Sequence, residues 1–140
     1  MVFDHDALDN LLESVSEAYP SEGCGLLLGS MNENRVRSVY TMKNLVGRER
    51  DLFEMDPLSV YEAECQAEKE GNRIVGFYHS HPDAPAIPSP QDEDHMIPGM
   101  LYVILSVWER KTRGIRAYKK QNLDGDMVSV PVSIMEEPGR

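Results

Sequence analysis

The sequence of 140 residues has only two cysteines and no long apolar run. Two thiols cannot form the disulfide framework of a small secreted domain, so we expect Cys24 and Cys65 to be reduced, buried side chains. A membrane-spanning helix needs about 20 consecutive apolar residues, and no stretch approaches that length. The first residues also lack the basic-then-apolar pattern of a secretory signal. These absences predict a cytoplasmic protein with no membrane partner.

Basic side chains are scarce as well. The chain has 14 lysines and arginines and 24 aspartates and glutamates, which gives a formal net charge of −10. A nucleic-acid partner would call for clustered basic residues that neutralise phosphates, so we expect none. The acidic excess suits a solvated surface, including adaptation to high salt, and it suits attraction to a basic substrate protein. Composition leaves both explanations open.

The hydrophobic content of 41% is enough for one compact domain with its own core. No repeat, low-complexity tract or linker divides the chain, so we expect a single domain over residues 1–135 and a disordered tail over 136–140.

Apolar spacing and turn residues predict a small mixed α/β domain. Helices are expected over residues 5–18, over 57–70 and from Ser89 onward; strands are expected over 24–28, 35–40, 73–79, 101–108, 114–119 and 127–132. One helix before the sheet and another that crosses it predict a mixed sheet with helices on both sides. We expect Trp108 to pack in the core or at the sheet edge.

The segment around His79-Ser-His81-Pro82 carries the strongest chemical signal. Side chains of a strand alternate faces, so His79 and His81 point the same way with Cα atoms roughly 6.6 Å apart. A proline-rich loop follows, and Ser89 then starts a short helix as its N-cap, with Asp92 in the first turn. The loop can therefore return Asp92 to the two histidines. Two imidazoles and one carboxylate are the ligand set of a catalytic zinc, which keeps its fourth position open.

These residues together resemble the JAMM, or MPN-plus, metallopeptidase family. Its signature is an upstream glutamate, then H-x-H-P, six residues, S, two residues and D, and the segment from His79 to Asp92 matches it without a gap. The family's upstream acid precedes a Cys-Gly pair and an apolar strand, and Glu22 stands in that position here. The resemblance covers most of the chain and implies the MPN fold, a curved mixed β-sheet flanked by helices.

The resemblance implies one zinc ion per chain, held by His79, His81 and Asp92, with Glu22 as general base and Ser89 as the group that stabilises the oxyanion. It implies hydrolysis of a peptide or isopeptide bond after the C-terminal Gly-Gly of a ubiquitin-like or sulfur-carrier protein. The bond could join that carrier to cysteine or to a lysine of another protein. The oligomeric state is not indicated.

Several alternatives stand beside this hypothesis. Glu22 is one of 24 acids and could be a solvated loop residue, and Ser89 could be a plain N-cap. A noncatalytic MPN scaffold is the main functional alternative, although such family members lack metal-site residues that are present here. A nucleotide deaminase needs a Pro-Cys-x-x-Cys pair, which the sequence lacks. Cys24 as a nucleophile is disfavoured by its apolar surroundings.

Two further segments have open roles. His95 could support the ligand set, although a solvent-facing helix position is the simpler interpretation. The loop around 46–53 could hold an extended substrate tail by adding a strand to a sheet edge, or it could be an ordinary connection.

Overall fold

The computed structural model describes residues 1–42, 56–122 and 125–135, without the side chains of Gln91 and His95. The expected substrate loop at 46–53 and the tail at 136–140 lie outside the described residues, as does the side chain of His95. The elements, in chain order, are β1 (Val2–Phe3), α1 (His5–Ala18), β2 (Cys24–Ser30), β3 (Arg35–Met42), α2 (Pro57–Lys69), β4 (Arg73–Pro82), α3 (Pro90–His95), β5 (Leu101–Trp108), β6 (Lys111–Lys120), β7 (Met127–Val130) and β8 (Ser133–Ile134).

All the described strands belong to one mixed sheet in the order β7-β6-β5-β4-β2-β3-β1-β8. The pair β4–β5 is parallel, whereas β2–β4, β2–β3 and β5–β6 are antiparallel. Strand β4 therefore lies in the middle of the sheet with partners on both sides. A central strand has its backbone fixed by two ladders, which makes it a rigid support for side chains that must hold a precise position.

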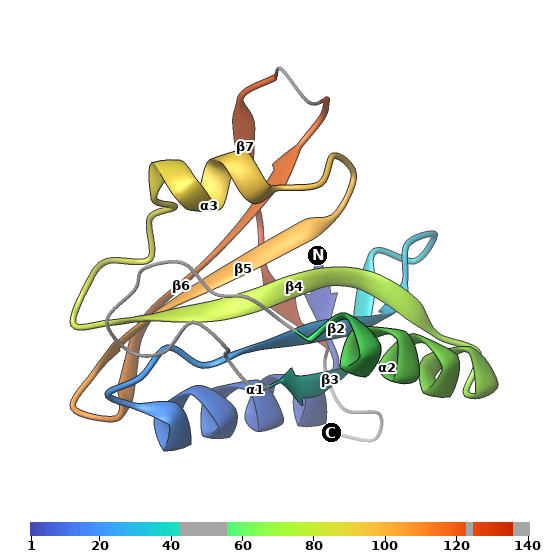
Figure 1. Cartoon of the computed structure of the whole chain (residues 1–140), viewed down its shortest axis with the longest axis horizontal. Coiled ribbons are helices and arrows are strands. Elements are labelled where there is room, and N and C mark those ends of the chain that lie inside the picture. Colours follow the sequence, from blue (N-terminus) through green and yellow to red (C-terminus); the bar gives the residue numbers. More distant parts are fainter. Residues whose placement is uncertain (43–55, 123–124, 136–140) are drawn as a thin grey trace.

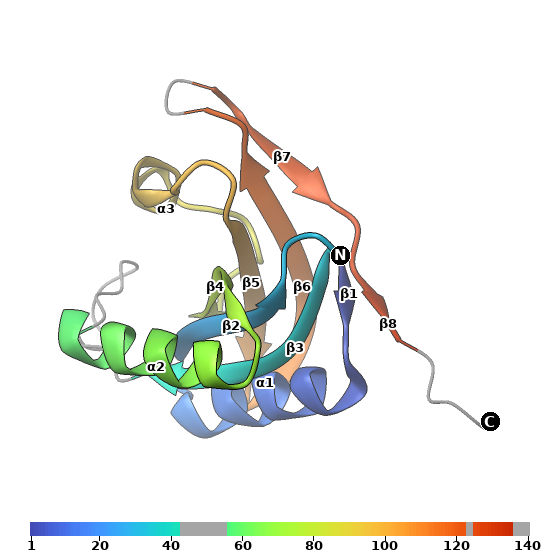
Figure 2. The same cartoon turned by 90° about the vertical axis from the view of Figure 1, so that its right-hand side faces the viewer.

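The sheet curls strongly, and its two edge strands, β7 and β8, are consecutive in the chain. Figure 2 shows β7 running into β8, which lies beside β1. Only Pro131 and Val132 separate β7 from β8. The N-terminal ammonium of Met1 donates to the Pro131 carbonyl at 3.1 Å, and the Ser133 amide donates to the Met1 carbonyl at 2.9 Å. These contacts fasten the last strand to the start of the chain.

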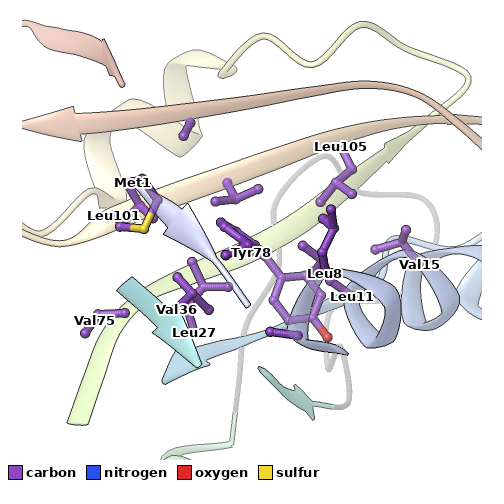
Figure 3. Close-up of a cluster of buried hydrophobic side chains, with 14 of the residues drawn as sticks. Met1, Leu8, Leu11, Val15, Leu27, Val36, Val75, Tyr78, Leu101 and Leu105 are labelled. Atoms are coloured by element: carbon purple, nitrogen blue, oxygen red, sulfur yellow. The ribbon is translucent and has the colours of Figure 1, made fainter. Parts of the chain in front are cut away.

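The main core lies between α1 and one face of the sheet (Figures 1 and 3). The buried residues of α1 are Ala7, Leu8, Leu11 and Val15, the helical spacing that predicted this element. They pack against sheet residues that include Leu27, Val36, Tyr78, Val103 and Leu105. This cluster fixes α1, and with it the turn that leads from α1 into β2.

The opposite face of the sheet packs against α2 and α3. Leu26 and Leu28 alternate with Leu27 along β2, and they contact Ala63 and Ala67 of α2. A third cluster contains Ala86, Met96, Tyr102, Ile104 and Tyr118 and holds the α3 region. The expected mixed sheet with helices on both sides is thus confirmed. Since His79 pairs with Cys24 and shares its face, it points toward the α2 and α3 side.

The expected elements are all present, and their bounds differ where tertiary contacts extend or end a strand. Strand β4 continues through Pro82 because β5 pairs with it as far as that residue. The predicted strand at 127–132 is too long, since β7 ends at Val130 before Pro131, which has no amide hydrogen. Trp108 is not in the core, because 42% of it is exposed. Strands β1 and β8 were not predicted, since two residues show no periodicity.

Candidate metal centre and active site

His79 and His81 meet over the centre of the sheet. They alternate with Ser80 on β4, so both rings project from the same face, and their Nε2 atoms are 3.1 Å apart. Both residues are buried. The strand spacing therefore brings two imidazole nitrogens to one point inside the protein, as the sequence predicted.

Asp92 arrives at the same point from α3. The chain leaves β4 at Pro82, crosses the proline-rich loop and enters α3, which lies over the sheet (Figure 1). Asp92 Oδ1 lies 3.3 Å from His79 Nε2, and Asp92 Oδ2 lies 3.2 Å from His81 Nε2. Asp92 is buried as well. Three side chains of metal-ligand type thus converge from two elements that are linked by the loop.

The separations of these ligand atoms suit a tetrahedral ion. Zinc binds nitrogen and carboxylate oxygen at about 2.0–2.1 Å, so tetrahedral geometry places two such ligand atoms roughly 3.3 Å apart. The distances between the three side chains are 3.1, 3.2 and 3.3 Å. Two imidazoles and one carboxylate are also the donor set expected for a catalytic zinc. The residues present therefore fit this metal.

The outer nitrogen of His81 has a partner that selects the right tautomer. His81 Nδ1 lies 2.9 Å from the carbonyl oxygen of Pro85. A carbonyl only accepts, so Nδ1 must carry the hydrogen and donate it. Nε2 of the neutral ring is then left with its lone pair directed at His79 and Asp92. Such hydrogen bonds from a ligand histidine to a carbonyl are typical of metal sites, because they fix the orientation of the ring.

The proline-rich loop is held at three successive carbonyls, those of residues 84–86. Ser106 Oγ donates to the first at 2.6 Å, His81 Nδ1 to the second at 2.9 Å and the Tyr118 hydroxyl to the third at 2.8 Å. Because the backbone of this loop is fixed, α3 and Asp92 keep one position over β4. Neither Ser106 nor Tyr118 stands out in the sequence, where the only signal is a lone serine within the apolar run of β5.

Ser89 caps α3 and still has a hydrogen to donate. Its Oγ accepts from the Asp92 amide at 3.0 Å, while the Ser89 amide donates to Asp92 Oδ2 at 2.9 Å. This reciprocal capping box confirms the predicted N-cap and also fixes the Asp92 carboxylate. The cap uses a lone pair of the hydroxyl and leaves its O–H free for another acceptor. Capping and oxyanion binding are therefore compatible functions of one hydroxyl.

Glu22 is buried next to these residues, with only 4% of it exposed. The turn after α1 brings it there, and the next residue is tied to β4. The Gly23 amide donates to Ser80 Oγ at 2.8 Å, and the Ser80 amide donates to the Gly23 carbonyl at 2.9 Å. Glu22, His81 and Ser89 then line one cavity of about 180 Å³. A solvated loop position for Glu22 is wrong, since the fold buries it beside the histidines.

Burial and charge set the protonation of the cluster. Burial lowers the pKa of His79 below its ordinary value and so favours the neutral ring. Burial alone would raise the pKa of Asp92, but hydrogen bonds with His79 and His81 outweigh it and hold that pKa below its usual range. Burial also opposes the charged form of His81, yet its contacts with Asp92 and the Pro85 carbonyl raise the pKa overall. An ionised Asp92 in this position favours any cation between the rings.

Cys24 does not have the properties of a nucleophile. It is fully buried, its Sγ donates to the Met42 carbonyl at 3.6 Å, and burial raises the pKa of the thiol to about 12. Reactive cysteines need a lowered pKa and some exposure. Cys24 is therefore a core residue. Cys65 is also a free thiol, and it is only half-buried on α2.

Comparison with known proteins places this chain in a family. Residues 4–120 match the family described as prokaryotic homologs of the JAB domain. A desampylase of Haloferax volcanii is 35% identical over an alignment of 115 positions, and the match covers 76% of this chain and 81% of that protein. A probable TtuB-protein conjugate cleaving protease of Thermus thermophilus is 34% identical over 99 residues, which are 71% of this chain and 62% of that protein.

Solved structures agree with the fold. The solution structure of a Desulfitobacterium hafniense protein superposes with a TM-score of 0.79 at 29% identity and covers 98% of this chain and 94% of that one. A JAB1/MPN domain protein from Archaeoglobus fulgidus superposes with a TM-score of 0.63 at 21% identity, covering 97% of this chain and all of that one. The architecture is therefore that of the JAB1/MPN fold.

Proposed function

The chain belongs to the family of prokaryotic JAB-domain homologues, and from this premise we propose that it is a zinc-dependent peptidase of the JAMM type. The observation that carries the proposal is the convergence of His79, His81 and Asp92 at one buried point, beside the cavity that Glu22 and Ser89 line. We propose that residues 1–135 form its single catalytic domain.

His79, His81 and Asp92 would hold one zinc ion per chain. When bound, zinc supplies Lewis acidity, which polarises a carbonyl and lowers the pKa of water from 15.7 to about 7. The Pro85 carbonyl keeps the Nε2 lone pair of His81 available for the metal, and Ser89 holds the Asp92 carboxylate through its amide. Neutral rings and an ionised carboxylate are the forms that bind metal, so binding needs no further proton release from His79 or Asp92.

Glu22 acts as the general base. Its carboxylate takes a proton from the attacking water and later gives it to the amine that leaves, a role worth typically 10²–10⁴-fold in rate. Burial supports this role because it holds the carboxylate at the cavity and out of bulk solvent. The proposal is supported by the cavity that Glu22 shares with His81, since we expect water and the scissile carbonyl to meet there.

Ser89 donates its hydroxyl hydrogen to the oxyanion that develops as the carbonyl is attacked. Removing one such donor from an enzyme costs about 10²–10³ in kcat. The capping box orients Ser89, so the donor needs little reorganisation during the reaction. The N-terminal end of α3 also carries partial positive charge near this position.

The substrate is a ubiquitin-like or sulfur-carrier protein conjugated through its C-terminal Gly-Gly. One relative is named as a desampylase, and another as a probable protease that cleaves TtuB-protein conjugates. The cavity of about 180 Å³ is small, and glycines suit it because their backbone can approach a wall without a side chain. The bond would join the carrier to a lysine of another protein or to cysteine.

The test uses a carrier protein that ends in Gly-Gly, joined either to a lysine of a second protein or to cysteine. Zinc-loaded wild-type protein should release free carrier and free acceptor, which mass spectrometry detects as two products whose masses together exceed that of the conjugate by one water. Glu22→Gln should keep about one zinc per chain and lose at least 100-fold in rate, because only the proton acceptor is removed. Glu13→Gln, a matched change at an exposed position of α1, should behave as the wild type.

Full turnover by Glu22→Gln would show that another group is the base. A native chain that binds zinc and cleaves neither conjugate would contradict this substrate class. A native chain that takes up no zinc at all would point to the noncatalytic scaffold instead.

A further inference from the structure

A second cavity, about 450 Å³ in volume, lies beside the catalytic one and has no role in the steps above. Its lining comes from the end of α1, the loop after β4 and the β5–β6 hairpin: Tyr19, Asp83, Trp108, Glu109 and Arg113. The cavity is more than twice the size of the catalytic cavity and opens to solvent. It has room for an entire side chain and the backbone that carries it.

The two cavities share one stretch of backbone as their wall. Pro82 and Ala84 line the catalytic cavity, whereas Asp83 between them lines the second one. The turn after α1 also contributes to both cavities, with Tyr19 in the second and Glu22 in the catalytic one. Successive residues of one loop thus line the two cavities, so we expect an extended polypeptide held at the catalytic cavity to run on toward the second one.

Hydrogen bonds fix the second cavity in relation to the catalytic loop. The Trp108 indole donates to Ser106 Oγ at 2.9 Å, and Ser106 Oγ donates to the Ala84 carbonyl at 2.6 Å. Across the cavity, the Tyr19 hydroxyl donates to Asp83 Oδ1 at 2.7 Å. The wall is therefore preorganised by the same loop that positions the catalytic residues, which is what a specificity site adjoining a reaction centre requires.

The lining has the chemistry of a cation site. Two carboxylates face one guanidinium, so the five side chains carry a net charge of −1, and the Trp108 indole is 42% exposed among them. An exposed indole beside carboxylates attracts an ammonium or guanidinium through its ring face, while the alkyl stem of a lysine or arginine covers the apolar ring. A neutral side chain could cover the ring but would lack the attraction of a cation, and an acidic one would be repelled by the two carboxylates.

We propose that this second cavity binds a lysine or arginine side chain of the protein to which the carrier is conjugated, close to the bond that is cleaved. The inference rests on the proposed function and extends it, because it names the chemistry of the leaving partner. The carrier tail occupies the catalytic cavity, and the basic residue of the leaving polypeptide occupies the neighbouring one. The preferred acceptor is thus a basic stretch of polypeptide rather than a lone cysteine.

The experiment compares acceptor peptides that carry the same Gly-Gly-linked carrier on a central lysine. The residues on both sides of that lysine are arginine in one peptide, glutamine in the second and glutamate in the third. Wild-type protein should cleave the arginine peptide with a kcat/KM about five times that of the glutamine peptide, the size expected for one exposed cation–aromatic contact with a nearby carboxylate. The glutamate peptide should be the poorest substrate.

Two substitutions should move this preference in opposite directions. Asp83→Asn keeps the acceptor for the Tyr19 hydroxyl and removes one negative charge. The kcat/KM of the arginine peptide divided by that of the glutamine peptide should therefore fall toward one. Arg113→Gln removes the only cation of the lining, so the ratio should rise. Asp126→Asn, which removes an exposed carboxylate outside the cavity, should leave the ratio at the wild-type value. This matched change separates a local contact from the effect of the net charge of −10.

Two results would overturn the inference. The first is equal cleavage of all three peptides by the wild type, which would leave the proposed function intact. An equal fall in the ratio for Asp83→Asn and Asp126→Asn would also overturn it, because net charge alone would then explain the preference. Zinc content and the thermal unfolding midpoint identify a variant that fails to fold. In that case Trp108→Leu repeats the test without a change of charge, and it should also lower the preference for the arginine peptide. A carrier joined to a small fluorescent amine tests the proposed function by itself, since it has no acceptor polypeptide.

Discussion

Gly23 and Ser80 exchange two hydrogen bonds, from the Gly23 amide to Ser80 Oγ at 2.8 Å and from the Ser80 amide to the Gly23 carbonyl at 2.9 Å. Ser80 stands between the two histidines, and Gly23 follows Glu22 directly. The pair therefore joins the proposed base to the proposed ligands across 57 residues of sequence. A side chain on Gly23 would lie 3.2 Å from Ala18 Cβ and 3.3 Å from Val15 Cα, so glycine also allows α1 to pack closely at this point.

Ser80→Ala should lower the rate of hydrolysis and leave zinc binding unchanged. The substitution removes the acceptor for the buried Gly23 amide, which costs about 1–3 kcal/mol and lets the turn that carries Glu22 move. We expect kcat to fall at least tenfold, measured together with zinc content per chain. Ser129→Ala, at an exposed position of β7, is the matched control. Wild-type activity in Ser80→Ala would mean that this pairing does not position Glu22.

Zinc should stabilise the folded chain, and the effect should depend on His81. An ion that binds only the native state adds about 2.7 kcal/mol when its concentration is 100 times its dissociation constant. Treatment with a chelator should therefore lower the thermal unfolding midpoint, and added zinc should restore it. His81→Ala should show neither response, whereas His5→Ala on the exposed face of α1 should respond as the wild type does. An equal response in both variants would place the zinc elsewhere.

Ser89→Ala should reduce both stability and activity, for separate reasons. Loss of the N-cap acceptor costs about 1 kcal/mol in the free energy of unfolding, measured by denaturant titration. Loss of the hydroxyl donor should lower kcat by about 10²-fold or more, measured far below the unfolding temperature. Ser89→Thr keeps both the acceptor and the donor, so it should retain most of each. If Ser89→Ala were destabilised and fully active, Ser89 would only be a cap.

Gly76→Ala should strongly destabilise the protein, because β5 lies too close for a side chain. A Cβ at this position would overlap the Leu101 carbonyl oxygen and would lie 2.8 Å from Leu101 Cβ. Both strands are central in the sheet and cannot separate easily, so we expect a cost of about 3 kcal/mol or more. At Gly114 the nearest atom is 3.9 Å away, and Gly114→Ala should change the free energy of unfolding little. Similar losses in both variants would contradict the close approach.

The sequence by itself determined the local structure around the site. Alternation along a strand put His79 and His81 on one face, because successive strand side chains point to opposite sides of a sheet. The order serine, proline and then an acid at the third helical position predicted the start of α3, since these residues satisfy the amide groups at a helix N-terminus. The proline-rich loop and the helix start at Ser89 also predicted that the chain would return Asp92 to the histidines. The roles of these residues in metal binding and hydrolysis stay predictions.

Spacing did not single out Glu22 among the 24 acids, and beyond the family resemblance only the tertiary structure decided that it lies beside the histidines. Glu22 is brought there by the packing of α1 and by the bonds between Gly23 and Ser80, and both depend on contacts between distant segments. The same holds for Ser106 and Tyr118, whose hydroxyls hold the proline-rich loop from neighbouring strands. Strands β1 and β8 exist because the sheet curls until its ends meet. Periodicity reports the environment of neighbouring residues, and it carries no information about which remote segment supplies the next contact.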